Sequence, residues 1–223
     1  MEELVQGYEH FRSKVFPQQK QLFTRLAQGQ QPDVLFLTCS DSRIVPDLIL
    51  QTQPGDLFIC RNAGNIVPPY GDRQGGVSAT IEYAVCALNV HHIVICGHSD
   101  CGAMKAVLEG GHLEDMPSVA SWLHHAESAR QLVEHSSISH ASKHERLRAM
   151  VRANVIQQLS HLRTHPSVAA RLQSGQITVH GWAYDIASGA IEAFDAEQAR
   201  FVPLERQRIA KAVERPRLEL LSA

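Results

Sequence analysis

The chain has 223 residues, a formal net charge of -2 and 44% hydrophobic residues, so it can bury the core of an ordinary globular protein. The near-neutral charge argues against nucleic-acid binding, which needs a basic face, and no run of about 18 apolar residues predicts a membrane span. Residues 1–14 lack the basic start and apolar stretch of a secretory signal, so we expect a cytoplasmic protein. Five cysteines, an odd number, argue against a disulfide framework in such a chain.

The first half of the chain alternates between helical and strand patterns. Residues 2–28 are predicted to form two amphipathic helices that break near Pro17. The apolar runs 34–40, 56–62 and 92–98 are typical of buried parallel strands. Helical spacing at 76–89 separates the second of these runs from the third.

The second half begins with a turn into a helix at 99–108. Two longer helices are expected at roughly 117–135 and 142–164. A strand pair is expected at 177–186 and 190–195, around Ser188-Gly189.

Strands that alternate with helices indicate an α/β fold. We expect a central, mostly parallel sheet of four to five strands flanked by helices. We divide the chain into an N-terminal helical arm at 1–30, an α/β domain at 31–200 and a C-terminal tail at 201–223. Ligands of such sheets bind beyond the carboxyl ends of the strands, where the strand order reverses. Cys39 and His98 each end a predicted strand, which suggests a shared site.

Two short motifs at these strand ends carry the chemistry, CSDSR at 39–43 and GHSDCG at 97–102. Zinc binds thiolates and imidazoles, and a catalytic zinc keeps three protein ligands and one position for water. Cys39, His98 and Cys101 can supply such a set, with Cys101 in the first turn of the helix that follows. Taken singly, each residue is more often a core or surface residue, but their joint placement favours a metal site.

Asp41 and Arg43 lie two positions apart and can face the same way. The guanidinium of arginine pairs with a carboxylate through two hydrogen bonds, which keeps the carboxylate ionised and oriented. Beside a zinc-bound water, Asp41 could accept a hydrogen bond from that water. Without zinc, the alternative is an ordinary ion pair in a surface loop.

The motifs resemble those of the β-carbonic anhydrases. The segments PGDLFICRNAGNIVPPYG, GGVSATIEYAVCALNV and IVICGHSDCGAM are similar to the core of that family, and HGWAYDIASG also fits. The resemblance extends over nearly the whole chain, and it is closest to a bacterial subgroup associated with cyanate degradation.

The resemblance implies one Zn²⁺ per chain, bound by Cys39, His98 and Cys101, with Asp41 and Arg43 as the catalytic pair. The implied reaction is the reversible hydration of carbon dioxide to bicarbonate and a proton, by attack of zinc-bound hydroxide. Two thiolates cancel the charge of the cation, so its water should be less acidic than in a site with three imidazoles. We therefore expect activity to rise on the alkaline side.

The resemblance also implies a substrate pocket and an oligomer. The pocket would contain the side chains Gln30, Phe58 and Tyr83 and the backbone of Gly102, some of them from a neighbouring subunit. From the sequence alone, Gln30 is more simply a loop amide, and Phe58 and Tyr83 are core aromatics. The N-terminal helices would pack on a partner in a homodimer or a dimer of dimers, although they could instead cover their own domain.

One departure from the family concerns regulation. A bicarbonate-regulated subgroup uses a Trp–Arg–Tyr site, and this chain has Arg61 and Tyr184 but Phe36 at the Trp position. We therefore expect an open, water-ligated zinc at neutral to basic pH.

Two other functions stay open at this point. The first is a different hydrolase that acts on a sulfur analogue of carbon dioxide. The second is a catalytically silent structural zinc or bicarbonate-sensing protein. The second would require the loss of Asp41 or Arg43, or a fourth cysteine or histidine ligand.

Overall fold

The computed structural model describes residues 1–71, 75–110 and 113–204, and the chain divides into two compact units, Met1–Gln31 and Pro32–Ala223. The first unit is helical up to Leu26, with α1 (Glu2–His10), a π-helical segment η1 (Phe11–Val15), α2 (Phe16–Gln18) and α3 (Lys20–Leu26). The helical backbone is interrupted at Gln19, where φ is -107° and ψ is 13°. No residue of these helices is buried. Whether they pack on a partner stays a prediction.

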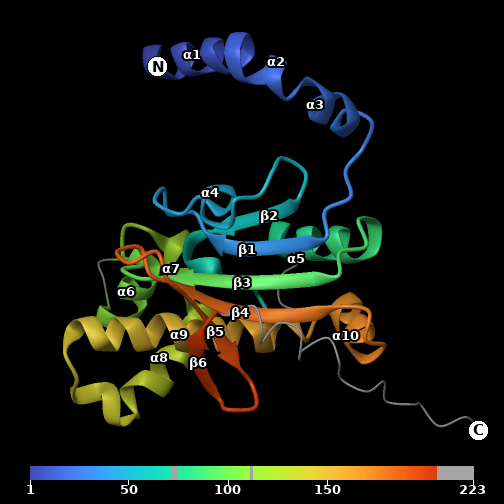
Figure 1. Ribbon diagram of the computed structural model, residues 1–223. Coiled ribbons are helices and arrows are strands. Elements are labelled where there is room, and N and C mark those ends of the chain that lie inside the picture. The colour runs from blue at the N-terminus through green and yellow to red at the C-terminus, as the bar shows by residue number, and fades with distance from the viewer. Residues whose placement is uncertain (72–74, 111–112, 205–223) are drawn as a thin grey trace, which may run out of the picture. The chain divides into compact units, whose positions relative to one another are not determined.

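A six-stranded sheet, in the order β2-β1-β3-β4-β5-β6, is the centre of the second unit (Figure 1). The strands are β1 (Val34–Cys39), β2 (Leu57–Asn62), β3 (His92–His98), β4 (Thr178–Tyr184), β5 (Ile191–Asp195) and β6 (Arg200–Pro203). The first four strands are parallel to their neighbours, while β5 and β6 are antiparallel. The α/β fold with a mostly parallel sheet is thus confirmed.

The sheet has one strand more than the four to five that we expected. The additional strand, β6, is only four residues long, too short to show a period of two in the sequence. It spans the position where we placed the start of the C-terminal tail. Of that tail, residues 205–223 lie outside the described residues.

Helices cover both faces of the sheet, as expected for an α/β fold. The α-helices of the second unit are α4 (Pro46–Leu50), α5 (Gly76–Glu82), α6 (Gly102–Glu109), α7 (Pro117–Leu123), α8 (Glu127–Glu134), α9 (Lys143–Leu162) and α10 (Pro166–Gln173). Short 3₁₀ or π helices also occur, and those of the second unit are η2 (Ala63–Asn65), η3 (Tyr83–Ala87), η4 (His124–Ala126) and η5 (Ser137–His140). None of the described helices is both long and apolar enough to cross a membrane.

Side chains of β1 alternate between two buried faces, as the geometry of a strand requires. Leu35 and Leu37 pack into the larger core with residues of η3, α9 and α10. Phe36 packs on the opposite face with Val94, Leu50 of α4 and Trp182. This double burial explains why the strand is a continuous apolar run rather than an alternating one.

The long helix α9 packs along β3 and β4 (Figure 1). Its first turn is fixed by a capping box, in which the Ser142 hydroxyl accepts from the Glu145 N–H and the Glu145 carboxylate accepts from the Ser142 N–H. Two glycines of the sheet face this helix. A methyl group at Gly97 would lie 2.9 Å from Val155 Cγ2, and one at Gly181 would lie 2.8 Å from Leu159 Cδ1. Glycine therefore lets the helix approach the sheet closely.

The strand order reverses between β1 and β3, because β2 lies on the far side of β1 and β4 on the far side of β3. This is the switch point at which ligands of parallel sheets bind. Cys39 ends β1 and His98 ends β3, so both motifs meet at this edge of the sheet.

Candidate metal centre

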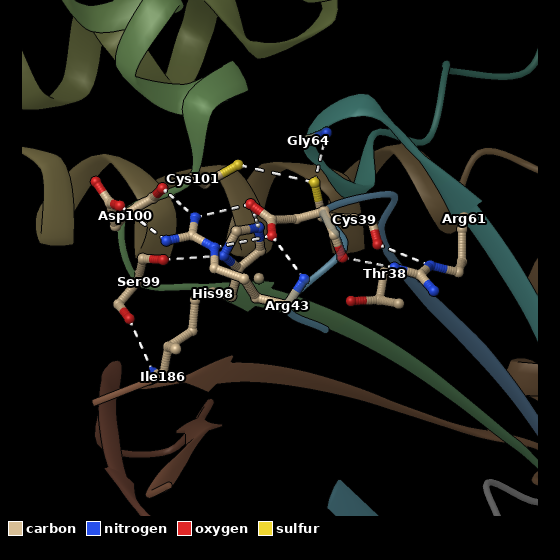
Figure 2. Close-up of polar contacts among 12 residues, drawn as sticks. Thr38, Cys39, Arg43, Arg61, Gly64, His98, Ser99, Asp100, Cys101 and Ile186 are labelled. Atoms are coloured by element: carbon tan, nitrogen blue, oxygen red, sulfur yellow. Dashed lines mark hydrogen bonds and ion pairs between the residues drawn. The ribbon is translucent and has the colours of Figure 1, made fainter. Parts of the chain in front are cut away.

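The structure brings the three predicted metal-binding side chains together. Cys39 Sγ lies 4.0 Å from Cys101 Sγ, and the ligand atoms of Cys39, His98 and Cys101 all lie within 4.8 Å of one another (Figure 2). Two thiolates on one tetrahedral zinc, at a Zn–S length of about 2.3 Å, would be about 3.8 Å apart. The side chains are 6%, 0% and 1% exposed. Their spacing and burial fit a zinc ion.

Cys101 lies one position earlier relative to its helix than we expected. It is the N-cap residue of α6, with φ -68° and ψ 118°, and the helix begins at Gly102. Asp100, before it, has a left-handed φ of 55°, which asparagine and aspartate tolerate better than most residues. This turn brings the Cys101 sulfur back over the end of β3.

The imidazole of His98 is oriented for metal binding through Nε2. Its Nδ1 lies 2.9 Å from the carbonyl oxygen of Ser99, so Nδ1 must carry the proton that it donates. The buried Nε2 has no hydrogen-bond partner among the described residues. A buried imidazole nitrogen with a free lone pair, beside two thiols, is the arrangement that a bound metal would satisfy.

The two sulfurs lie close enough to share one proton in a hydrogen bond. The hydrogen bond from Cys101, with that from the Gly64 N–H, lowers the pKa of Cys39. The same contact with the Cys39 thiolate, together with burial, raises the pKa of Cys101. A divalent cation would displace the shared proton, because metal-bound cysteines are thiolates.

Asp41 is held by Arg43. Its Oδ1 accepts from the backbone N–H and Nε of Arg43 at 3.0 and 2.9 Å, and its Oδ2 accepts from Nη2 at 2.8 Å. These hydrogen bonds hold the pKa of Asp41 well below its usual range and raise that of Arg43. Oδ2 lies 3.9 Å from His98 Nε2, so an ionised, oriented carboxylate lies beside the metal ligands.

Two further residues hold the site, and the sequence did not single out either role. Arg43 Nη1 and Nη2 donate to the carboxylate and the carbonyl of Asp100, each at 3.0 Å. Arg61 donates to the carbonyls of Cys39 and Asp41 at 3.0 and 2.7 Å. Asp100 lies inside the second motif, but its contact with Arg43 depends on the left-handed backbone at Asp100, which the motif does not reveal. Arg61 gives no local signal, because β2 pairs with β1 only in the folded sheet.

The predicted pocket residues are not all brought to these ligands within one chain. Gly102 follows Cys101 directly and begins α6. The Phe58 and Tyr83 rings pack on each other, with centroids 5.9 Å apart, but Phe58 lies four positions before Asn62, the partner of Cys39. That separation along β2 is about 13 Å. Gln30 belongs to the first unit.

A proton shuttle cannot be chosen from the sequence, which offers four candidates, and these lie in two different places: His91, His92, His124 and His125. His91 and His92 lie at the start of β3, and His98 lies at its end, so roughly 20 Å of strand separates them from the metal ligands of their own chain. They contact Asp33 instead, at 2.6 and 3.6 Å. His124 and His125 form η4, which packs against α6.

No fourth cysteine, histidine or carboxylate joins the group of three among the described residues. Asp41 points to Arg43 rather than completing a closed set. Three donors with an open position are typical of a catalytic zinc, whereas structural zinc sites have four.

Comparison with known proteins identifies the family. A family model described as "Carbonic anhydrase" matches residues 34–191. The carbonic anhydrase of Pseudomonas aeruginosa is 52% identical over 213 residues, covering 96% of each chain, and carbonic anhydrase 1 of Escherichia coli O157:H7 is 52% identical over 204 residues, covering 92% of each. The solved β-carbonic anhydrase CcaA matches with a TM-score of 0.89 at 42% identity, covering 93% of each chain. The chain belongs to the β-class carbonic anhydrases.

Membership of the β-carbonic anhydrases gives the chain its activity, the interconversion of carbon dioxide and bicarbonate by a lyase. Tetrameric β-carbonic anhydrases of Sordaria macrospora also share the fold, with a TM-score of 0.80 at 31% identity over 87% of this chain and 96% of theirs. In the described part of the chain, Cys39, His98 and Cys101 form a group of side chains that could hold a metal ion.

Proposed function

We propose that this chain hydrates carbon dioxide at one zinc ion held by Cys39, His98 and Cys101. The observation that carries the proposal is the convergence of two buried sulfurs and an unpartnered imidazole nitrogen at the switch point of the sheet. Zinc in such a site acidifies a bound water, so that it can attack the carbon of carbon dioxide near neutral pH.

The residues around the metal ligands would orient the reactants. Asp41, kept ionised by Arg43, accepts the hydrogen bond of the attacking water and thereby points its lone pair at the substrate carbon. Because Asp41 already accepts three hydrogen bonds from Arg43, it is a weak base and directs the nucleophile rather than storing its proton. Asp100 and Arg61 keep this pair and its loop in place.

We also propose that the substrate pocket is completed between two copies of the chain. Phe58 and Tyr83 contact each other far from their own metal ligands, and Tyr83 is 51% exposed. An exposed aromatic that is distant from its own site can serve the site of a partner. The tetrameric relatives from Sordaria macrospora support an oligomer. A cytoplasmic location and a role beside cyanate degradation stay predictions.

Stopped-flow hydration of carbon dioxide on zinc-quantified protein tests the assignment. We expect one zinc per chain, activity that is lost when a chelator removes the metal, and recovery when zinc is restored. The rate should rise on the alkaline side, because two thiolates neutralise the cation. Zinc-free protein with full activity would contradict the proposal, as would a pH–rate profile that is already flat from mildly acidic pH upward.

A further inference from the structure

The peptide group that joins Ala63 to Gly64 contacts a metal ligand directly. Its N–H, on Gly64, donates to Cys39 Sγ at 3.4 Å (Figure 2). Gly64 has φ 79° and ψ 20°, and a Cβ there would lie 2.9 Å from Met104 Cε. Glycine suits this position, because a side chain would be strained at this positive φ and its Cβ would crowd Met104 and Ala103 of α6. Hydrogen bonds to a metal thiolate hold the sulfur in place and lower its electron density.

A tryptophan from a distant segment holds the other end of the same peptide group. Trp122, on α7, donates its indole N–H to the carbonyl oxygen of Ala63 at 2.9 Å. The Ala63 carbonyl and the Gly64 N–H belong to one planar unit, so a bond to the oxygen fixes the direction of the N–H. It also polarises that N–H and strengthens its bond to sulfur.

The next peptide group is held by a buried amide of α9. Asn154 donates to the Gly64 carbonyl oxygen at 3.0 Å and accepts from Gln158 Nε2 at 2.8 Å. Gln158 in turn accepts from the Val67 N–H at 2.9 Å. Asn154 and Gln158 are both fully buried. Buried amides are costly unless they are bonded, and here their bonds go to the loop that carries Gly64.

These amides belong to a stripe of polar side chains that faces the loop. Toward the C-terminal end of α9, His161 Nδ1 lies 2.8 Å from the Val67 carbonyl oxygen. At the start of α10, His165 Nε2 lies 3.0 Å from the Pro68 carbonyl oxygen. The four positions 154, 158, 161 and 165 recur at helical spacing. One face of α9, continued to the start of α10, therefore binds the backbone of residues 64–68 in place of apolar packing.

We propose that Trp122 and Asn154 are positioning residues for the metal centre, which fix the Gly64 N–H against the Cys39 sulfur. Neither side chain contacts the metal ligands, and both act through the Gly64 backbone. The proposal rests on the zinc site proposed above. It assigns a role at the metal to an indole N–H and an amide that the motifs around the ligands do not include.

The test compares zinc affinity and a spectroscopic signature in single variants of the full chain. Trp122→Phe keeps an aromatic ring but lacks the donor, and Asn154→Ala lacks the donor without burying a charge. We expect zinc affinity, measured by competition with a chelator, to fall by about tenfold or more in each variant. In Co²⁺-substituted protein, the thiolate-to-metal charge-transfer band should move to lower energy, because a sulfur that loses a hydrogen bond gives up its electrons more readily.

Leu162→Ala is the matched control. Leu162 is also fully buried and on α9, so its truncation destabilises the fold without removing the side-chain hydrogen bonds to the Ala63 and Gly64 carbonyls. The control should keep zinc affinity within about twofold of the wild type and leave the band in place. A core substitution that removes none of these hydrogen bonds affects stability independently of zinc binding. An unmoved band with wild-type zinc affinity in Trp122→Phe and Asn154→Ala would overturn the proposal, as would a control that changes by the same amount.

Zinc binding by the wild-type chain distinguishes failure of the proposed zinc site from failure of the role given to Trp122 and Asn154. If the wild-type chain binds no stoichiometric zinc, the proposed zinc site fails, and the role of Trp122 and Asn154 at that site fails with it. If the wild type binds zinc and the variants bind it equally well, only the role of Trp122 and Asn154 fails.

Discussion

At the residue scale, Asp41 is held firmly by Arg43 and lies beside the metal ligands. Its carboxylate accepts from three N–H groups of Arg43 and lies 3.9 Å from His98 Nε2. We expect Asp41→Asn to bind zinc normally but to slow carbon dioxide hydration by roughly 10²-fold or more, because an amide cannot accept the hydrogen bond of the nucleophile in the same way. Zinc analysis and stopped-flow kinetics on one preparation measure both quantities.

Asp100→Asn is the matched control for Asp41→Asn. It makes the same carboxylate-to-amide change at the other partner of Arg43, on a side chain that is 68% exposed. We expect it to lose less than about tenfold, because an exposed ion pair contributes little. Equal losses in the two variants, or unchanged turnover in Asp41→Asn, would remove the assigned role of Asp41.

His180 gives a second prediction at this scale, one of stability rather than catalysis. Burial, with the charge of nearby His92, lowers the pKa of His180 to about 4, and its Nε2 lies 2.9 Å from Thr178 Oγ1. A depressed histidine pKa means that the folded state holds the neutral ring. Its contribution is therefore complete above the unfolded pKa of about 6.5 and is lost as the pH falls toward 4.

We expect His180→Gln to lose less stability on acidification than the wild type. The difference in the free energy of unfolding should be about 2 kcal/mol at pH 5, relative to the difference at pH 7.5. Urea unfolding at the two pH values measures it. A parallel pH dependence in the two proteins would show that His180 does not titrate as a buried group.

The metal ligands could be predicted from the sequence, whereas the groups that hold them could not. Cys39, His98 and Cys101 each lie beside an apolar strand, and their side-chain types name the chemistry. Trp122 and Asn154 act on backbone groups, and a backbone carbonyl has no signature in the sequence. Their role depends on contacts between residues 59 and 90 positions apart in the sequence, which only the folded chain reveals.

At the scale of elements, α9 was predicted as a helix, but the burial of its polar face was not. The sequence predicts a helix at 142–164, and the structure has one at Lys143–Leu162. The polar positions 154 and 158 would ordinarily be assigned to solvent, yet both are buried against the Gly64 loop. Periodicity distinguishes polar from apolar residues, but it does not say whether a polar face meets water or backbone.

Short elements were missed for a related reason. The five residues of α4 and the four of β6 are shorter than the window in which a period can be recognised. The helix expected at 117–135 is divided by η4 into α7 and α8, a change of winding that leaves the apolar spacing almost unaltered. Long, buried strands were predicted well because double burial leaves an uninterrupted apolar run.

The capping box of α9 makes a prediction at the element scale. Ser142→Ala removes the acceptor for the Glu145 N–H and should lower the free energy of unfolding by about 1 kcal/mol. Catalysis per bound zinc should not change, because the cap residues Ser142 and Glu145 bond to each other and not to the metal ligands or to Asp41 and Arg43. Thermal or urea unfolding, with activity in parallel, measures both effects.

Ser137→Ala supplies the control for the cap, because Ser137 is an exposed serine of the neighbouring η5 segment. We expect its stability to stay within about 0.5 kcal/mol of the wild type. If the two serine variants unfold together, the capping box contributes nothing measurable.

At the scale of the whole molecule, the shared pocket can be tested by mixing two inactive variants. Cys101→Ala lacks a metal ligand, and Tyr83→Ala lacks the proposed pocket aromatic. If Tyr83 serves the partner's site, each mixed dimer has one intact site. Mixed dimers make up half of a fully exchanged population, so we expect about a quarter of wild-type activity.

Light scattering on each variant must first show that it assembles like the wild type, which we expect to be a dimer or a dimer of dimers. Activity of the mixture that stays at the sum of the two variants would place Tyr83 in its own chain's site or outside any site. A monomeric wild type would contradict the shared pocket as a whole.

The close approach of α9 to the sheet limits how this enzyme can change. Gly97 immediately precedes His98, so any side chain at 97 pushes β3 away from Val151 and Val155 and carries the imidazole with it. A metal centre tolerates ligand errors of only about 0.2 Å. Protein engineers who replace flexible glycines by alanine to gain heat resistance should therefore expect Gly97→Ala to yield a chain that folds yet holds its cation poorly. At this position, the narrow space between Gly97 and α9 limits both thermostability and retention of the metal ion.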